Sequence, residues 1–109
     1  MFFDHLFGSG KKTRFFWPKS AEDASKLAVE IRLGRLDANA KDYDNSPLLF
    51  IALLHKFPNL VVTALQHGAN PNAHLNTGDP SLAHYLHGNY FNPYLIRLLL
   101  SYGMKYDDV

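Results

Sequence analysis

The sequence of 109 residues contains no cysteine, which excludes disulfide bonds, thiolate catalysis and zinc sites with cysteine ligands. It also lacks any apolar run of the roughly 18 residues that are needed to cross a bilayer. Charged residues make up only 19% of the chain and the formal net charge is +1, so nucleic acid and anionic membranes are not expected partners. With 47% hydrophobic residues, the chain has the composition of one globular domain.

The first seven residues, MFFDHLF, have neither the basic start nor the long apolar stretch of a secretory signal. The absence of cysteine also suits a reducing compartment. We therefore expect a protein without membrane association and with a cytoplasmic location.

Several segments carry the signals that start and stop helices. Ser20 and Asp23 form an N-cap pattern ahead of apolar residues spaced as on one helix face, and Gly34 stops the run, which predicts a helix at about 20–33. Further starts are expected where a capping side chain precedes a proline in the first turn, at Ser46-Pro47, Asp79-Pro80 and Asn92-Pro93, and also at Pro58. Further helix ends are expected at Gly68 and Gly103. No segment shows sustained alternation of polar and apolar residues, which predicts no strand beyond a short ribbon in a loop. The sequence therefore predicts an all-α fold.

The sequence also repeats itself. Asn39-Ala40 recurs 33 residues later as Asn72-Ala73, and Leu65 recurs 34 residues later as Leu99. The segment QHGANPNA at 66–73 closely resembles the helix end and loop of ankyrin repeats, whose period is about 33 residues. Ser46-Pro47-Leu48 resembles the T-P-L with which the first helix of such a repeat starts, although the histidine that usually follows is absent.

This resemblance implies an ankyrin-like stack of helix-turn-helix repeats, an all-α solenoid similar to short, degenerate ankyrin-like proteins of bacteria. We expect about two full repeats plus a partial first one, at about 20–40, 41–73 and 74–106. Residues 20–109 would then form the repeat domain, and residues 1–19 an aromatic and basic capping segment.

The segment 1–19 holds six aromatic residues: Phe2, Phe3, Phe7, Phe15, Phe16 and Trp17. Because a short stack has apolar ends to cover, a cap is the favoured role. A partner-binding anchor is the alternative, since aromatic residues are frequent at binding hot spots. The basic residues nearby are too few to indicate a nucleic-acid site.

Chemical sites are sparse. His84 and His87 share one helix face, and His74 with Asp79 could complete a zinc site, but no recognised zinc-binding spacing is present, so surface histidines are favoured. The serines lie at caps or turns and the acidic residues form no evident pair. We therefore expect no enzyme and no cofactor.

The resemblance implies that the chain binds another protein through loop tips and the first helix of each repeat. The corresponding positions in this sequence are Lys41, Tyr43, Asp44, Leu54, His74, Asn76, Thr77, Asp79, His84 and His87. Tyr43 is the first candidate because it is an aromatic residue at an exposed tip, whereas Asp44 and Asn76 can equally serve to form turns.

The expected function is stoichiometric protein binding, in the manner of an inhibitor or immunity protein that occludes a toxin or enzyme. The alternative is a self-assembling structural protein that forms a homodimer through an apolar edge of the C-terminal helix.

Overall fold

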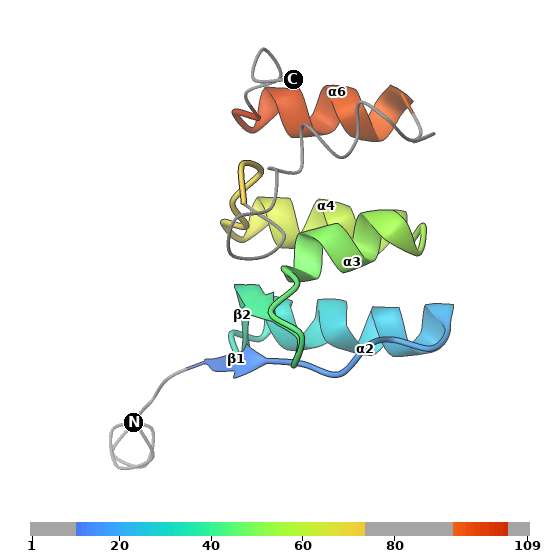
Figure 1. The fold of residues 1–109 in the computed structure, drawn as a ribbon, viewed down its shortest axis with the longest axis vertical. Coiled ribbons are helices and arrows are strands. Elements are labelled where there is room, and N and C mark those ends of the chain that lie inside the picture. Colours follow the sequence, from blue (N-terminus) through green and yellow to red (C-terminus); the bar gives the residue numbers. More distant parts are fainter. Residues whose placement is uncertain (1–10, 74–92, 105–109) are drawn as a thin grey trace.

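The computed structural model describes residues 11–73 and 93–104 of the chain (Figure 1). Its elements, in chain order, are β1 (Lys12–Arg14), α2 (Ala21–Arg32), β2 (Leu36–Lys41), α3 (Leu48–Leu54), α4 (Pro58–Gln66) and α6 (Pro93–Ser101). Along the long axis they form three layers, with α2 and the strands at one end, α3 and α4 in the middle, and α6 at the other end (Figure 1).

The expected all-α solenoid is wrong, because β1 and β2 pair as a parallel two-stranded sheet and the fold is mixed α/β. Helix α2 connects the two strands, as parallel pairing requires a crossover between them. Within β2, Leu36, Ala38 and Ala40 are buried while the residues between them are more exposed. This alternation is the period of a strand, and small alanines between polar residues made it resemble a loop.

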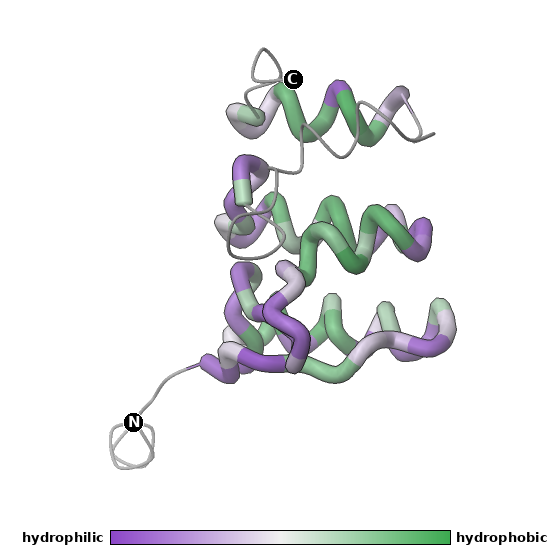
Figure 2. Tube along the Cα trace, viewed as in Figure 1, coloured by the Kyte–Doolittle hydropathy of each residue, from purple (hydrophilic) through white to green (hydrophobic). Residues whose placement is uncertain are grey.

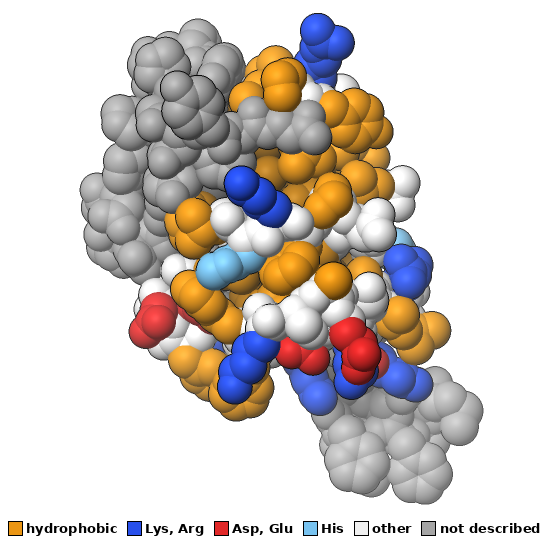
Figure 3. All heavy atoms as spheres, turned by 90° about the vertical axis from the view of Figure 1, so that its right-hand side faces the viewer, with side chains coloured by type: hydrophobic (Ala, Val, Ile, Leu, Met, Phe, Trp, Pro, Cys, Tyr) orange, Lys and Arg blue, Asp and Glu red, His pale blue; other side chains and the backbone are white. Residues whose placement is uncertain are grey.

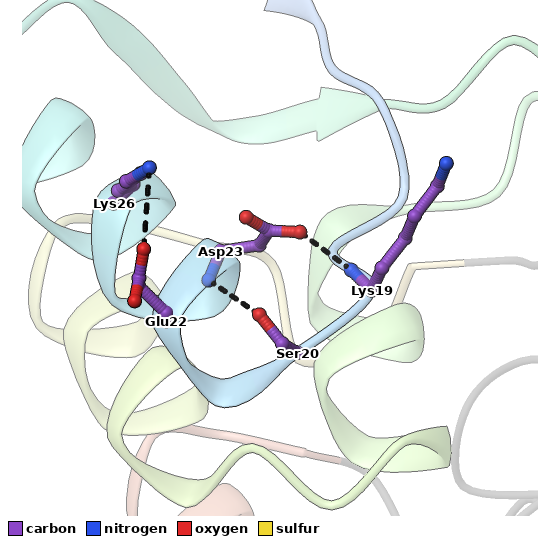
Figure 4. A network of polar contacts seen from close by, with 5 residues as sticks. All are labelled: Lys19, Ser20, Glu22, Asp23 and Lys26. Atoms are coloured by element: carbon purple, nitrogen blue, oxygen red, sulfur yellow. Dashed lines mark hydrogen bonds and ion pairs between the residues drawn. The ribbon is translucent and has the colours of Figure 1, made fainter.

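Helix α2 begins as its sequence predicts (Figure 4). The backbone N–H of Asp23 donates to Oγ of Ser20 at 3.2 Å, and Oδ2 of Asp23 accepts from the backbone N–H of Lys19 at 3.0 Å. These bonds satisfy two donors at the helix start, and the Asp23 carboxylate lies where the helix dipole favours negative charge. One turn further on, Lys26 forms an exposed ion pair with Glu22 at 3.6 Å.

Helices α2, α4 and α6 end in the same way, and their predicted stops are confirmed. Gly34, Gly68 and Gly103 follow the three helices with positive φ angles of 77°, 98° and 100°. In each case the residue after the glycine donates its N–H to a carbonyl five residues earlier, which is the Schellman motif. Helix α3 ends with the same bonds, but Lys56 occupies the left-handed position there with φ of 60°.

The starts of α3 and α4 differ in how closely they follow the sequence prediction. Pro58 is the first residue of α4, as predicted. Pro47 is the N-cap of α3 and no side chain caps that helix, so the predicted capping role of Ser46 is wrong. The reason lies in the preceding loop, where the N–H of Ser46 donates to Asp42 Oδ1 and its carbonyl accepts from Asp42 N–H.

The core is centred on α4, which packs against α3 in its own layer and against α2 and α6 of the neighbouring layers. Hydrophobic residues follow the sides of the helices that face one another, most densely in the middle layer (Figure 2). The largest fully buried side chains of the core are Leu48, Leu49, Ile51, Leu53, Leu60, Val61 and Leu99. None of the helices within residues 11–73 and 93–104 has both the length and the apolar character needed to span a bilayer.

The repeated Asn-Ala pair corresponds to a repeated contact. Asn39 Nδ2 donates to the carbonyl of Gly68 at 3.0 Å, and Asn72 Nδ2 donates to the carbonyl of Gly103 at the same distance. Asn39 also accepts from the N–H of Asn70 through Oδ1 at 2.7 Å. Asn39 thus joins β2, and Asn72 joins the turn after α4, to the helix end of the next layer.

Candidate functional site

The loop after β2 is built around one buried carboxylate. Asp42 is only 2% exposed, and its Oδ1 accepts the backbone N–H groups of Asp44 and Ser46, both at 2.8 Å. An aspartate that accepts from residues two positions on is a common device for closing a turn. Asn45 lies in the same loop with a positive φ of 65°, a conformation that asparagine tolerates better than most residues. The loop therefore has a defined shape.

The segment from Arg14 to Trp17 forms hydrogen bonds with this loop and with the end of β2. The indole Nε1 of Trp17 donates to Oδ2 of Asp42, and Arg14 Nη1 donates to the Asp42 carbonyl at 2.9 Å and to Asn45 Oδ1 at 2.7 Å. The N–H of Phe15 donates to the carbonyl of Lys41 at 3.2 Å. Two segments about 28 residues apart in sequence therefore lie side by side.

Where they meet, aromatic side chains gather at the surface. The rings of Phe16 and Tyr43 lie 5.0 Å apart, and those of Trp17 and His55 lie 4.6 Å apart, edge to face. We call these four residues the aromatic surface. Phe57 extends it at the start of α4, with its ring 6.4 Å from that of His55.

The aromatic surface is exposed to solvent, although the backbone beneath it is anchored in the core. Phe16 is 78% exposed, Tyr43 65% and Trp17 45%, whereas the neighbouring Phe15 is 4% exposed and belongs to the core. Phe15 fixes the backbone of the segment, so Phe16 and Trp17 keep their places at the surface. Figure 3 shows the side of the molecule on which the α3–α4 turn and the start of α2 lie. On this side, hydrophobic side chains lie around a histidine, and basic and acidic side chains lie below it.

Three of the residues predicted to bind a partner lie in this region. Lys41 is the exposed last residue of β2, Tyr43 belongs to the aromatic surface, and Asp44 is exposed beside it. Asp42 rather than Asp44 closes the turn with its side chain. Leu54 is half-buried at the end of α3, so the structure does not place it in the loop with the other three.

The other predicted binding residues fall outside the described residues: His74, Asn76, Thr77, Asp79, His84 and His87. Their roles stay predictions, as does the zinc alternative that joins three of these histidines. Within residues 11–73 and 93–104, no group of three or more histidine, aspartate or glutamate side chains is placed to hold a metal ion.

Two residues of the site went unnoticed in the sequence. Asp42 carried a signal, because an aspartate that opens the polar run Asp42 to Ser46 is typical of a turn. His55 carried none, since it contacts Trp17 only through tertiary packing between segments distant in sequence.

The chain matches no protein-family model, and comparisons with curated proteins and with solved structures gave no match either. The site must therefore be interpreted from its own geometry.

Proposed function

We propose that this chain is a protein-binding domain and that it engages its partner through the aromatic surface and the adjoining loop. One observation carries this proposal: Phe16 and Tyr43, both largely exposed, pack against each other on a base fixed by Phe15 and Asp42. Isolated apolar residues at a protein surface are ordinary, but a cluster of aromatic rings is typical of binding sites.

The composition of the surface supports a protein as the ligand. Tyrosine and tryptophan supply large contact areas with few rotatable bonds, so ordering them on binding costs little entropy. Lys41 and Asp44 at the margin provide the polar rim of a typical interface. Occluding an enzyme or toxin with such a surface requires no chemistry from this chain, so an inhibitor or immunity role fits the proposal.

Affinity capture tests the proposal. The tagged full chain is incubated with lysate of its native source, and the retained proteins are identified and quantified by mass spectrometry. We expect one protein in an amount close to that of the bait, and a complex of defined stoichiometry when the two purified proteins are mixed. If no protein is retained above the level of an unrelated tagged control, the proposal fails.

Self-assembly is the second candidate, and one observation favours it. Tyr94, Leu100 and Tyr102 of the α6 layer are exposed hydrophobic residues at the end of the molecule opposite the strands. Sedimentation velocity over a hundredfold range of concentration separates the two candidates. A monomer throughout this range excludes the homodimer, whereas a concentration-dependent dimer with no captured partner supports it.

A further inference from the structure

A groove of about 700 Å³ lies beside the aromatic surface, at the α2 end of the molecule. Its volume is in the range of ligand-binding clefts. The extended segment 12–19 forms one wall, and the exposed flank of α2 forms the other. Phe16, Trp17 and Tyr43 belong to both the groove and the aromatic surface, so the two features form one continuous region.

The chemistry of the groove is apolar at its base and mainly basic at its margin. Besides the three aromatic residues that it shares with the aromatic surface, its apolar lining consists of Phe15, Pro18, Leu27 and Leu36, of which all but Leu27 are buried. Four cationic residues line it, against two acidic ones: Lys12, Arg14, Lys19, Lys26, Asp23 and Glu30.

The acidic residues of the groove are already engaged. Asp23 accepts at the start of α2, and Glu30 pairs with Arg35 at 3.3 Å. Lys12 and Lys19, by contrast, have no carboxylate partner among the residues that the structure describes. Lys26 pairs with Glu22 outside the groove, so among the described lysines that line it, Lys12 and Lys19 are the ones that offer unpaired positive charge to a ligand.

From this complementarity we infer that the groove binds an extended, acidic segment of the partner protein that also carries apolar side chains. The inference rests on the proposed function and names the chemistry of the partner. The wall from Lys12 to Lys19 spans roughly 23 Å if fully extended, which matches about seven extended residues of a ligand. The apolar base, which includes Phe15, Leu27 and Leu36, suits the apolar side chains of a peptide better than the phosphates of a nucleic acid.

Trp17 provides the measurement, because it is the only tryptophan of the chain and it lines the groove. The full chain is titrated with an acetylated eight-residue peptide that carries two leucines flanked by glutamates, and Trp17 fluorescence is followed. Three matched probes accompany it: the same peptide with lysine for glutamate, the same peptide with serine for leucine, and an eight-nucleotide oligothymidylate. We expect saturable binding of the acidic, leucine-containing peptide and weaker binding of all three others.

Charge reversal locates the site. Lys12→Glu combined with Lys19→Glu should weaken binding of the acidic peptide by about tenfold, since each exposed charge pair contributes modestly to affinity. Arg97→Glu on the distant α6 is the matched control and should leave the affinity within about twofold. Circular dichroism melts verify that the variants are folded.

The inference is overturned if the acidic peptide binds no better than the lysine or serine probes, or if Lys12→Glu with Lys19→Glu leaves its affinity unchanged. Tighter binding of oligothymidylate would assign the groove to nucleic acid instead, and a fluorescence change with protein concentration alone would assign it to a second copy. These outcomes leave the proposed function standing as long as a captured partner depends on Phe16 and Tyr43. If binding of the captured partner does not depend on Phe16 and Tyr43, the proposed function is refuted, whereas the peptide titrations still test the groove separately.

Discussion

The indole of Trp17 donates a hydrogen bond to the buried carboxylate of Asp42, and this contact joins the N-terminal segment to the loop after β2. The same carboxylate closes the loop through two backbone N–H groups. One side chain thus sets both the shape of the loop that carries Tyr43 and the place of Trp17 beside it. Substitutions at Asp42 should therefore affect folding and the surface together.

Asp42→Asn should lower the free energy of unfolding by about 1–3 kcal/mol. An amide can accept the two loop N–H groups, but its NH₂ then faces the donor of Trp17, and a buried donor is left unpaired. Chemical denaturation followed by Trp17 fluorescence measures the change. Asp44→Asn is the control and should alter stability by less than about 0.5 kcal/mol, because the exposed Asp44 enters the turn through its backbone. Equal effects of the two substitutions would refute the role of Asp42.

Phe15 and Phe16 are neighbours with opposite roles, so their substitutions should separate stability from binding. Phe15→Ala should cost about 3–5 kcal/mol because it empties a core position, whereas Phe16→Ala should cost less than about 1 kcal/mol. Thermal unfolding compares them, and Phe15→Leu replaces the alanine variant if that one does not fold. A larger loss for Phe16→Ala than for either variant at Phe15 would contradict the burial of Phe15.

Lys56→Gly should stabilise the protein by about 0.5–1 kcal/mol. Lys56 lies just after α3 with φ of 60°, where a β-carbon costs about 1–2 kcal/mol. Glycine removes this cost but loses part of the gain through the entropy of the unfolded chain. Lys56→Ala keeps the β-carbon and should show no such gain. Thermal melts of the two variants test the assignment, and a stabilisation of the alanine variant equal to that of glycine would contradict it.

Asn39→Ala should loosen the contact between neighbouring layers. It removes a bond to the carbonyl of Gly68 and another from the N–H of Asn70, and because the site is exposed we expect a cost of only about 1–2 kcal/mol. Hydrogen exchange of the Asn70 amide should accelerate by more than global destabilisation explains. Asn59→Ala, at an exposed position early in α4, is the control. Unchanged protection of Asn70 would show that the bond contributes nothing.

Local signals in the sequence predicted the helices better than the sheet. The cap at Ser20, the proline at position 58 and the glycine stops act within one turn of chain, so a pattern of a few residues suffices to detect them. β1 has only three residues and gains its structure by pairing with β2 across α2. Such pairing depends on tertiary contacts that short-range patterns do not encode, and for this reason the all-α expectation was wrong.

The same distinction applies to the site. The exposure of Tyr43 was predicted from its place at a loop tip in the ankyrin-like pattern, and the structure places it at the surface. The contacts of Tyr43 with Phe16 and of Trp17 with His55 join segments that are far apart in sequence. The sequence thus indicated single members of the aromatic surface but not that they form one cluster.

The most direct test of the account is the affinity of the captured partner for the double variant Phe16→Ala/Tyr43→Ala, measured by calorimetry beside the native chain. Tyr102→Ala is the matched control, since this tyrosine is 42% exposed and lies at the opposite end of the molecule. We predict that the double variant stays folded and loses at least about thirtyfold in affinity, as expected for the loss of a binding hot spot, while Tyr102→Ala remains within about twofold. A folded double variant that binds within about threefold of the native chain would contradict the account.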